Sequence, residues 1–230
     1  MSEIGESSIF LIIMQLSDSA YPTGGFTHSM GCEALLQRSY IANKIDIKKA
    51  IVSILENSGS FNIPYVQDSY DNCEDLDHLC QLDDLYHVSL NNQVASRVSR
   101  QQGKSMLFTS EETFKCTNFS KFQLLIDNGN INGHHAIVFG FICAVLKISK
   151  SHTLQMYLFT VLRTVITSLV RLGCIGPIEA QTLQYHMQKM IPDIIQRNID
   201  KNVEDASIIF PLIDVFQNSH DTLFRKMFYS

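Results

Sequence analysis

The residues best able to do chemistry are histidines and cysteines that stand close together in the sequence. His28 and Cys32 are four positions apart, so on a helix they would share one face and could supply two ligands to nickel or zinc. His134 and His135 are adjacent and would point about 100° apart on a helix, which suits a helix start better than chelation. We therefore expect no tight metal site in the monomer, and the open alternative is a metal enzyme or direct metal carrier that uses these four side chains.

Nucleophilic and phosphate-binding motifs are incomplete. Ser29 stands in Thr-His-Ser-Met-Gly, which lacks the first glycine of a Gly-x-Ser-x-Gly nucleophile elbow. The run from Gly24 to Ser29 contains no Gly-Lys-Ser/Thr, so it does not match a P-loop. Asp83 and Asp84 are neighbouring carboxylates within an acidic region. The sequence therefore favours a protein that is not an enzyme and has no cofactor.

A loop near the start of the chain concentrates turn formers, hydroxyls and acids over residues 15–33. Pro22 fixes its own φ, and the glycine pair 24–25 can adopt positive φ, so the chain should reverse direction here. We expect a helix to begin near Thr27, with the hydroxyls of Thr27 and Ser29 as its caps. The loop is predicted to shape the fold and a partner-facing surface.

The elements that position these residues are predicted to be helices. Apolar residues recur at helical spacing, and turn formers separate the runs. The apolar runs are 47–55, 76–86 and 154–172, and the expected breaks are Gly59 with Pro64, 127–133, 173–177 and Pro192. The sequence predicts an all-α, single-domain helical bundle of roughly eight to ten helices over residues 1–230, with 1–8 flexible. The run 154–170 contains Gln155 and Arg163, so it predicts a buried core helix and not a membrane span.

Composition narrows the class of partner. The chain has 230 residues, 45% of them hydrophobic, which is enough for one large core. Its net charge of −5 gives no electrostatic footprint for nucleic acid or for an anionic membrane, so proteins are the expected partners. The six cysteines form no Cys-x-x-Cys pair, which favours a reduced, cytoplasmic location.

Charges are unevenly distributed along the chain. Residues 71–84 contain six acids and no Lys or Arg, whereas Arg97, Arg100 and Lys104 follow on the next expected helix. A solvated helix face is the first interpretation, because surface ion pairs contribute only about 0 to 1 kcal/mol. The alternatives are that the two segments pair with each other, or that one of them meets a partner.

Five blocks of sequence, taken in order, resemble the urease accessory protein F family. The first is the loop at 15–33. The others are Ala95-Ser96-Arg97 with Arg100-Gln101-Gln102-Gly103-Lys104-Ser105-Met106-Leu107, Gly133-His134-His135-Ala136-Ile137-Val138-Phe139-Gly140, Arg171-Leu172-Gly173-Cys174-Ile175-Gly176-Pro177-Ile178-Glu179-Ala180-Gln181, and His220-Asp221-Thr222-Leu223-Phe224-Arg225-Lys226-Met227-Phe228. Together they span the chain nearly from end to end.

The resemblance implies a helical, non-enzymatic scaffold of the complex that inserts nickel into urease. Such a protein would dimerise, bind the accessory D protein (also called H), and through that complex engage the accessory G GTPase and the urease apoprotein. The blocks imply these partner-binding residues: Asp18, Pro22, Gly24, Gly25, Phe26, His28, Ser29, Glu33, Gln102, Gly103, His220, Leu223, Phe224, Arg225, Lys226 and Phe228.

Two positions depart from the family pattern. The tail has Lys226 where the family usually places Arg, with Arg225 one position earlier, so a bidentate contact would be lost or shifted. Cys32 stands where the family has an apolar residue, which favours packing over metal binding. A second alternative to the scaffold is a catalytic GTPase activator, with Arg225 or Arg171 as the arginine supplied in trans.

The last eleven residues, 220–230, are predicted to be a partner-binding tail. Phe224, Met227, Phe228 and Tyr229 cluster there beside two cations, which is the composition of an interface hot spot. Docking of the tail onto the protein's own core is the alternative. If the tail serves a partner, deletion of residues 224–230 should leave a folded protein and abolish complex formation.

Overall fold

Helices account for all the regular structure in residues 6–228, the part of the chain that the computed structural model describes, with the side chains of Glu6 and Phe26 excepted. The α-helices are α1 (Glu6–Ser17), α2 (Cys32–Gln37), α3 (Lys44–Asn57), α4 (Ile63–Asp71), α5 (Leu76–Ser89), α6 (Gln93–Phe114), α7 (Thr117–Asp127), α8 (His135–Val145), α9 (Lys150–Arg171), α10 (Pro177–Met187), α11 (Ile191–Asn198) and α12 (Pro211–Asn218). Short helices η1 (Gly25–Thr27), η2 (Ser58–Asn62), η3 (Gln188–Met190), η4 (Val203–Asp205) and η5 (Ser219–Thr222) join or extend them.

The all-α prediction is confirmed. The chain passes from α3 into α4 through η2, and from α10 into α11 through η3, without leaving helical conformation. The described residues contain twelve α-helical segments. Because two pairs of these segments are joined without a break, they form ten continuous helices, which is the upper end of the expected number. The predicted flexible start, 1–8, is described only from residue 6, where α1 begins.

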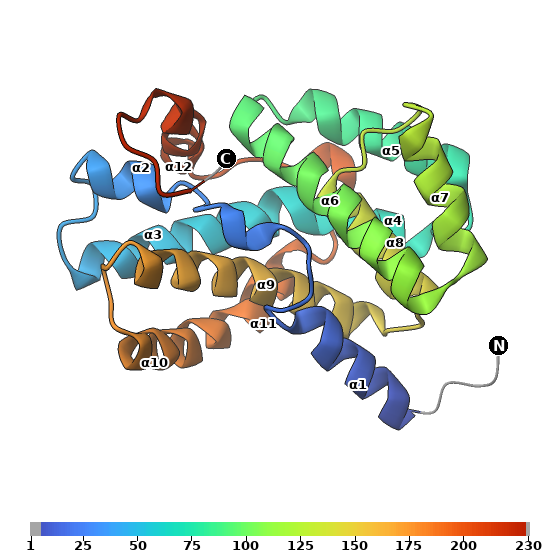
Figure 1. Ribbon diagram of the computed structural model, residues 1–230, viewed down its shortest axis with the longest axis horizontal. Coiled ribbons are helices and arrows are strands. Elements are labelled where there is room, and N and C mark those ends of the chain that lie inside the picture. Colours follow the sequence, from blue (N-terminus) through green and yellow to red (C-terminus); the bar gives the residue numbers. More distant parts are fainter. Residues whose placement is uncertain (1–5, 229–230) are drawn as a thin grey trace.

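Helix α9 passes through the middle of the molecule (Figure 1) and contacts α1, α2, α3, α4, α8, α10 and α11. Leu154, Leu158, Leu162 and Val165 are fully buried on it, so the core-helix prediction for this segment is confirmed. By length and composition alone α9 is apolar enough to cross a membrane, and it is the one such helix in the described part of the chain. Its apolar faces are covered by the surrounding helices.

The predicted break at Gly59 and Pro64 is wrong. Residues 58–62 form a π-helix, η2, that links α3 directly to α4. A π-helical turn shifts the hydrogen-bond register, so it can absorb the missing N–H of Pro64 near the start of α4. A Cβ at Gly59 would lie 2.3 Å from Cγ2 of Ile194, so this glycine serves close packing against α11 and does not mark a turn.

A buried carboxylate holds the loop before α8. Asp83 is 0% exposed, and its oxygens accept hydrogen bonds from the backbone N–H groups of Asn132 (2.7 Å), Gly133 (3.3 Å) and His134 (2.7 Å). Burial raises the pKa of Asp83, and these hydrogen bonds oppose the shift. One member of the acidic segment is therefore an internal anchor and not part of a solvated face.

The acidic segment does not pair with the basic residues that follow it. Asp71 pairs with Lys150 at 2.5 Å, whereas Arg97 pairs with Asp221 at 2.9 Å. These partners come from distant parts of the chain, so a sequence window around residues 71–104 could not reveal them.

Helix α8 is enclosed by α4 on one side and α6 on the other, and glycines permit both contacts. A Cβ at Gly140 would lie 2.1 Å from Oγ of Ser69, and a Cβ at Gly103 would lie 2.1 Å from the carbonyl oxygen of Gly133. Both distances are shorter than real Cβ contacts, so any side chain at these positions would force the helices apart.

We predict that Gly140→Ala and Gly103→Ala each lower the free energy of unfolding by about 1 to 3 kcal/mol or more, because the added methyl group overpacks a helix contact. Urea unfolding monitored by circular dichroism measures the change. Gly176→Ala is the matched control, since a Cβ there meets nothing within 4 Å. Equal stability of all three variants would contradict the proposed close approach.

Candidate functional site

The first loop folds differently from expectation in two respects. Thr27 and Ser29 cap no helix: η1 spans Gly25–Thr27, and α2 begins only at Cys32, with Gly31 as its N-cap and no side-chain cap. The hydroxyl of Thr27 instead donates to the carbonyl of Gly24 at 2.8 Å. The capping prediction fails because the backbone turns a second time before the helix starts.

Positive φ angles mark both turns of this loop. Gly24 has φ +74°, as the sequence suggested, whereas Gly25 lies in η1. The second positive-φ glycine is Gly31, at +85°. Asp18 and Pro22 lie exposed on the loop's outer side, and Asp18 accepts the backbone N–H of Ala20 at 2.8 Å.

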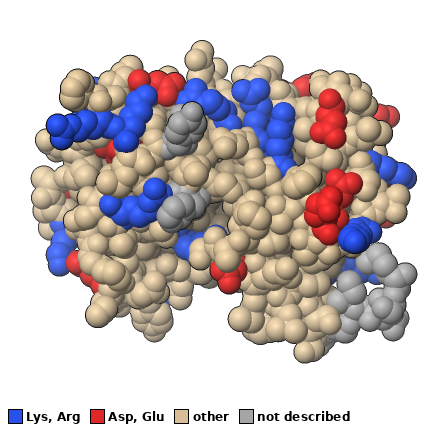
Figure 2. Space-filling model, viewed as in Figure 1, with Lys and Arg blue, Asp and Glu red and all other residues tan. Residues whose placement is uncertain are grey.

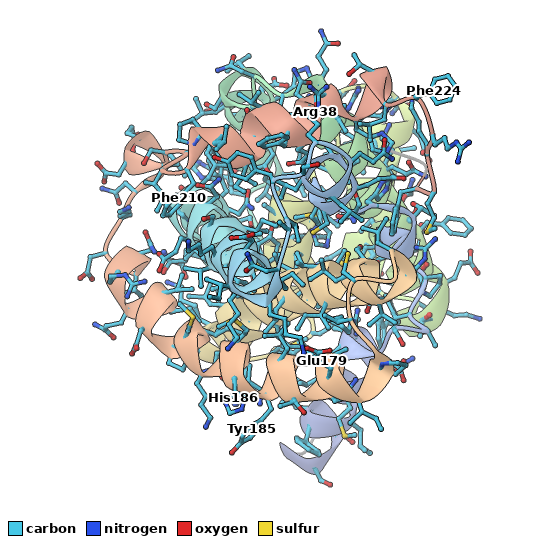
Figure 3. The ribbon with its side chains drawn as sticks, turned by 90° about the vertical axis from the view of Figure 1, so that its left-hand side faces the viewer. Arg38, Glu179, Tyr185, His186, Phe210 and Phe224 are labelled. Atoms are coloured by element: carbon cyan, nitrogen blue, oxygen red, sulfur yellow. The ribbon has the colours of Figure 1, made fainter. Side chains whose placement is uncertain are left out.

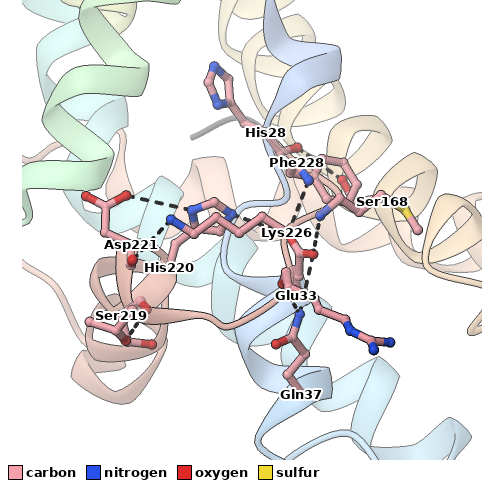
Figure 4. Close-up of polar contacts among 12 residues, drawn as sticks. His28, Glu33, Gln37, Ser168, Ser219, His220, Asp221, Lys226 and Phe228 are labelled. Atoms are coloured by element: carbon pink, nitrogen blue, oxygen red, sulfur yellow. Dashed lines mark hydrogen bonds and ion pairs between the residues drawn. The ribbon is translucent and has the colours of Figure 1, made fainter.

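Glu33 forms the centre of a polar cluster that joins the first loop to the chain end (Figure 4). Its side chain is only 2% exposed. Oε1 accepts the backbone N–H of Met227 at 2.6 Å, and Oε2 accepts that of Phe228 at 3.3 Å. Nε2 of His220, itself 2% exposed, lies 3.3 Å from Oε2. A buried carboxylate requires such donors, so docking of the tail satisfies Glu33.

Other contacts hold the tail at its edges. Gln37 donates from Nε2 to the carbonyl of Arg225 at 2.7 Å, and Lys226 donates from Nζ to the carbonyl of Asp221 at 3.0 Å (Figure 4). The guanidinium of Arg171 lies 4.2 Å from the ring centroid of Phe228. Three of the five sequence blocks, the loop, the Arg171 block and the tail, therefore meet at one place, which we call the Glu33 corner.

Some residues of the Glu33 corner were missing from the sequence prediction. Gln37, the last residue of α2, donates to the carbonyl of Arg225, and Arg38, which follows the helix as its C-cap, donates to the hydroxyl of Thr222. Gln37 stands four residues after Glu33 on a helix, so spacing alone could have placed it on the same face. Arg38 carries no comparable signal.

The tail divides into a docked and an exposed part. Phe228 is 3% exposed, whereas Phe224 is 96% exposed and Met227 is 56% exposed. Figure 3 shows Phe224 pointing away from the bundle. Leu223 is half-buried, and the side chains of Arg225 and Lys226 are exposed. Tyr229 and Ser230, with the side chain of Phe26, lie outside the described residues.

A second group of predicted residues lies inside the bundle. Gln102 and Gly25 line a small cavity of about 70 Å³ with His135 and Tyr157, and Gln102, His135 and Tyr157 also line a neighbouring cavity of about 100 Å³. A Cβ at Gly25 would lie 3.2 Å from Nε2 of Gln102, so the loop packs directly on α6. Gly103, His28, Ser29 and Glu33 are buried, so in this chain they support the surface from beneath.

The four candidate metal ligands do not form one set. Nε2 of His28 lies 3.1 Å from the hydroxyl of Thr27, whereas His134 contacts Ser99 through Nδ1 and His87 through Nε2, both at 3.1 Å. Cys32 is fully buried in the core, and burial raises the pKa of its thiol to about 12. Across residues 6–228 no three His, Cys, Asp or Glu side chains are grouped to hold a metal ion.

The three histidines among these candidates stay neutral because desolvation disfavours their charged form, and it lowers the pKa of His135 to about 4. Desolvation lowers the pKa of His28 to about 4, with the nearby charges of His220 and Arg97 adding to the effect. Desolvation likewise lowers the pKa of His134 to about 3, with smaller contributions from His87, Arg100 and Lys104. His28 and His134 are each less than 3% exposed.

We predict that stability falls as pH falls from about 6.5 toward 4. In the unfolded chain His28, His134 and His135 take up protons near pH 6.5, whereas in the folded chain they resist protonation until about pH 4, 3 and 4. The unfolded state then binds up to three more protons, which corresponds to a slope of up to about 4.1 kcal/mol per pH unit. Urea unfolding at several pH values measures the slope. His186→Gln, at an exposed histidine, should leave it unchanged, and a flat profile in the parent would contradict the assignment.

We also predict that Glu33→Gln releases the tail. The amide keeps one acceptor oxygen but places an NH₂ group toward the backbone donors of Met227 and Phe228, at a cost of about 1 to 3 kcal/mol. Hydrogen exchange of these two amides should become faster than in the parent. Glu179→Gln, which changes a surface pair with Lys44, is the control. Unchanged protection of both amides would show that Glu33 does not hold the tail.

Comparison with known proteins supports the family resemblance of the sequence. The profile of the UreF family matches residues 41–188. The chain is 33% identical over 218 residues to a urease accessory protein F of Oryza sativa subsp. indica, covering 93% of this chain and 82% of that protein. It is 30% identical over 220 residues to that of Arabidopsis thaliana (94% and 90%) and 27% identical over 230 residues to the UreF of Trichodesmium erythraeum (99% and 98%). The chain belongs to the UreF family of urease accessory proteins.

Proposed function

We propose that this protein is a non-catalytic scaffold of the complex that inserts nickel into urease. Family membership gives it a urease accessory role in the maturation of a nickel enzyme. The finer proposal is that it bridges a D/H-type accessory protein and the G-type GTPase, acts as a homodimer in the cytoplasm, and reaches the urease apoprotein through that complex. Nickel is the cargo of this assembly.

The observation that carries the proposal is an exposed aromatic side chain on an anchored chain end. Glu33 and Gln37 hold the backbone of the tail at Met227, Phe228 and Arg225, while Phe224 remains 96% exposed. An ordered terminus that exposes a large aromatic group loses less conformational freedom on binding than a free end would. Aromatic residues beside arginine are also common hot spots of protein interfaces.

The first alternative, a direct metal carrier, has less support. Its four candidate ligands are divided between the Glu33 corner and the start of α8, and each histidine already contacts another side chain. Dialysed protein that retained stoichiometric nickel, and lost it on His28→Ala with Cys32→Ala, would favour the carrier.

The second alternative, a catalytic GTPase activator, depends on an arginine that can reach a partner. Arg171 already lies over the ring of Phe228, whereas the side chain of Arg225 is exposed. A GTPase rate that rises by several orders of magnitude with the parent and not with Arg225→Ala would favour this activity. The scaffold proposal expects no such dependence on one arginine.

We predict that Phe224→Ala weakens binding to the D/H-type accessory protein by at least about tenfold while leaving stability within about 0.5 kcal/mol, because this side chain touches little of its own chain. Phe228→Ala should instead destabilise the fold or release the tail, since its ring is buried beneath Arg171. Calorimetric titration and urea unfolding separate the two effects.

The matched control for this prediction is Val215→Ala. This variant truncates an exposed apolar side chain that lies on α12 and not on the tail. Parent and control should bind equally. If Phe224→Ala also binds equally, the exposed part of the tail is not the contact that joins the partners.

A further inference from the structure

The first half of α6 and the tail carry a strip of basic residues on one face of the molecule. Arg97, Arg100 and Lys104 stand three and four residues apart, so they share one side of α6 over about 10 Å. At one end Arg97 pairs with Asp221, whose carbonyl accepts from Lys226, so the strip continues onto the tail. Figure 2 shows Lys and Arg gathered across the upper half of this face.

The strip is poorly neutralised by the protein's own acids. Among the residues that the structure describes, Asp221 is the one carboxylate that forms an ion pair with the strip, and no Asp or Glu of this part of the chain lies within 4.0 Å of the charged atoms of Arg100, Lys104 or Lys226. The whole chain nevertheless carries a net charge of −5. A basic face on an acidic protein favours an acidic partner surface, which the rest of the molecule would repel.

Arg100 adds a more specific indication. Its Nε is buried and has no hydrogen-bond partner in the described part of the chain. A buried donor without an acceptor is costly. Arg100 as a whole is half-buried, and carboxylates match a guanidinium in a bidentate arrangement, so an acidic side chain of a partner would suit this position.

The neighbouring side chains favour a protein over a nucleic acid. Phe224 and Phe108 are 96% and 58% exposed, on the tail and on α6. Exposed aromatic groups next to arginines are typical of protein interfaces, whereas sequence-independent binding of nucleic acid needs a more extensive basic surface. We propose that Arg100, Lys104 and Lys226 form one docking surface for an acidic patch of the D/H-type accessory protein. The identity of the partner rests on the proposed function.

The experiment compares charge reversals with equal change in net charge. The test variant is Arg100→Glu with Lys104→Glu, and the control is Lys48→Glu with Lys121→Glu, at exposed positions on α3 and α7. Affinity for the purified D/H-type protein is measured by titration at low and high salt. The test variant should bind at least about tenfold more weakly at low salt, and the control within about twofold of the parent. The parent's affinity should fall with salt more steeply than that of the test variant.

The other possible results of this titration decide between the docking surface and the proposed function. If the parent binds the D/H-type protein and the test variant binds equally well, the docking surface is refuted while the proposed function stands. If the parent does not bind that protein, both are refuted. Arg100→Gln with Lys104→Gln, which removes charge without reversing it, should give an intermediate loss, and melting curves of all variants establish that they fold. A labelled DNA duplex that binds the parent and not the test variant would assign the strip to a nucleic acid and overturn the proposal.

Discussion

The structure of the candidate site depends on one buried carboxylate. Glu33 is removed from water in the wall of the bundle, and a charge in that position is tolerated only when hydrogen-bond donors surround it. The donors are the main-chain N–H groups of Met227 and Phe228, with His220 beside them. The chain end and the first loop are thereby fixed to each other across almost the whole length of the sequence.

Asp83 repeats the same arrangement before α8. It is buried and accepts three consecutive backbone N–H groups at the start of α8. Both acids fix irregular backbone segments that no helix could hold by itself. The helices around α9 form the apolar frame, and the two carboxylates determine where the connecting segments lie on it.

The helical spacing of apolar residues predicted the helices well. A helix that buries one apolar face needs an apolar residue every three to four positions, and the sequence shows this spacing directly. The run 154–172 became α9, and 76–86 lies within α5. Local rules failed at two places: residues 58–62 continue the helix as a π-helix in which Gly59 packs against Ile194 of α11, and Thr27 caps no helix because the backbone turns a second time before α2 begins. The partners of Glu33, nearly two hundred residues away, left no trace in sequence spacing, although the resemblance had marked both segments.

Tail docking through main-chain donors has a consequence for how this family member can change over time. Glu33 and Gln37 contact the backbone at residues 225, 227 and 228, so these contacts do not depend on which side chains those residues carry. The side chains at 225 and 227 can therefore change during evolution, and an exchange of Arg225 with Lys226 leaves the contacts of Glu33 and Gln37 with the backbone unaffected. Only proline, which has no N–H, is barred from positions 227 and 228 by this geometry. The outward-facing chemistry of the tail can thus follow that of a partner while the attachment beneath it stays constant.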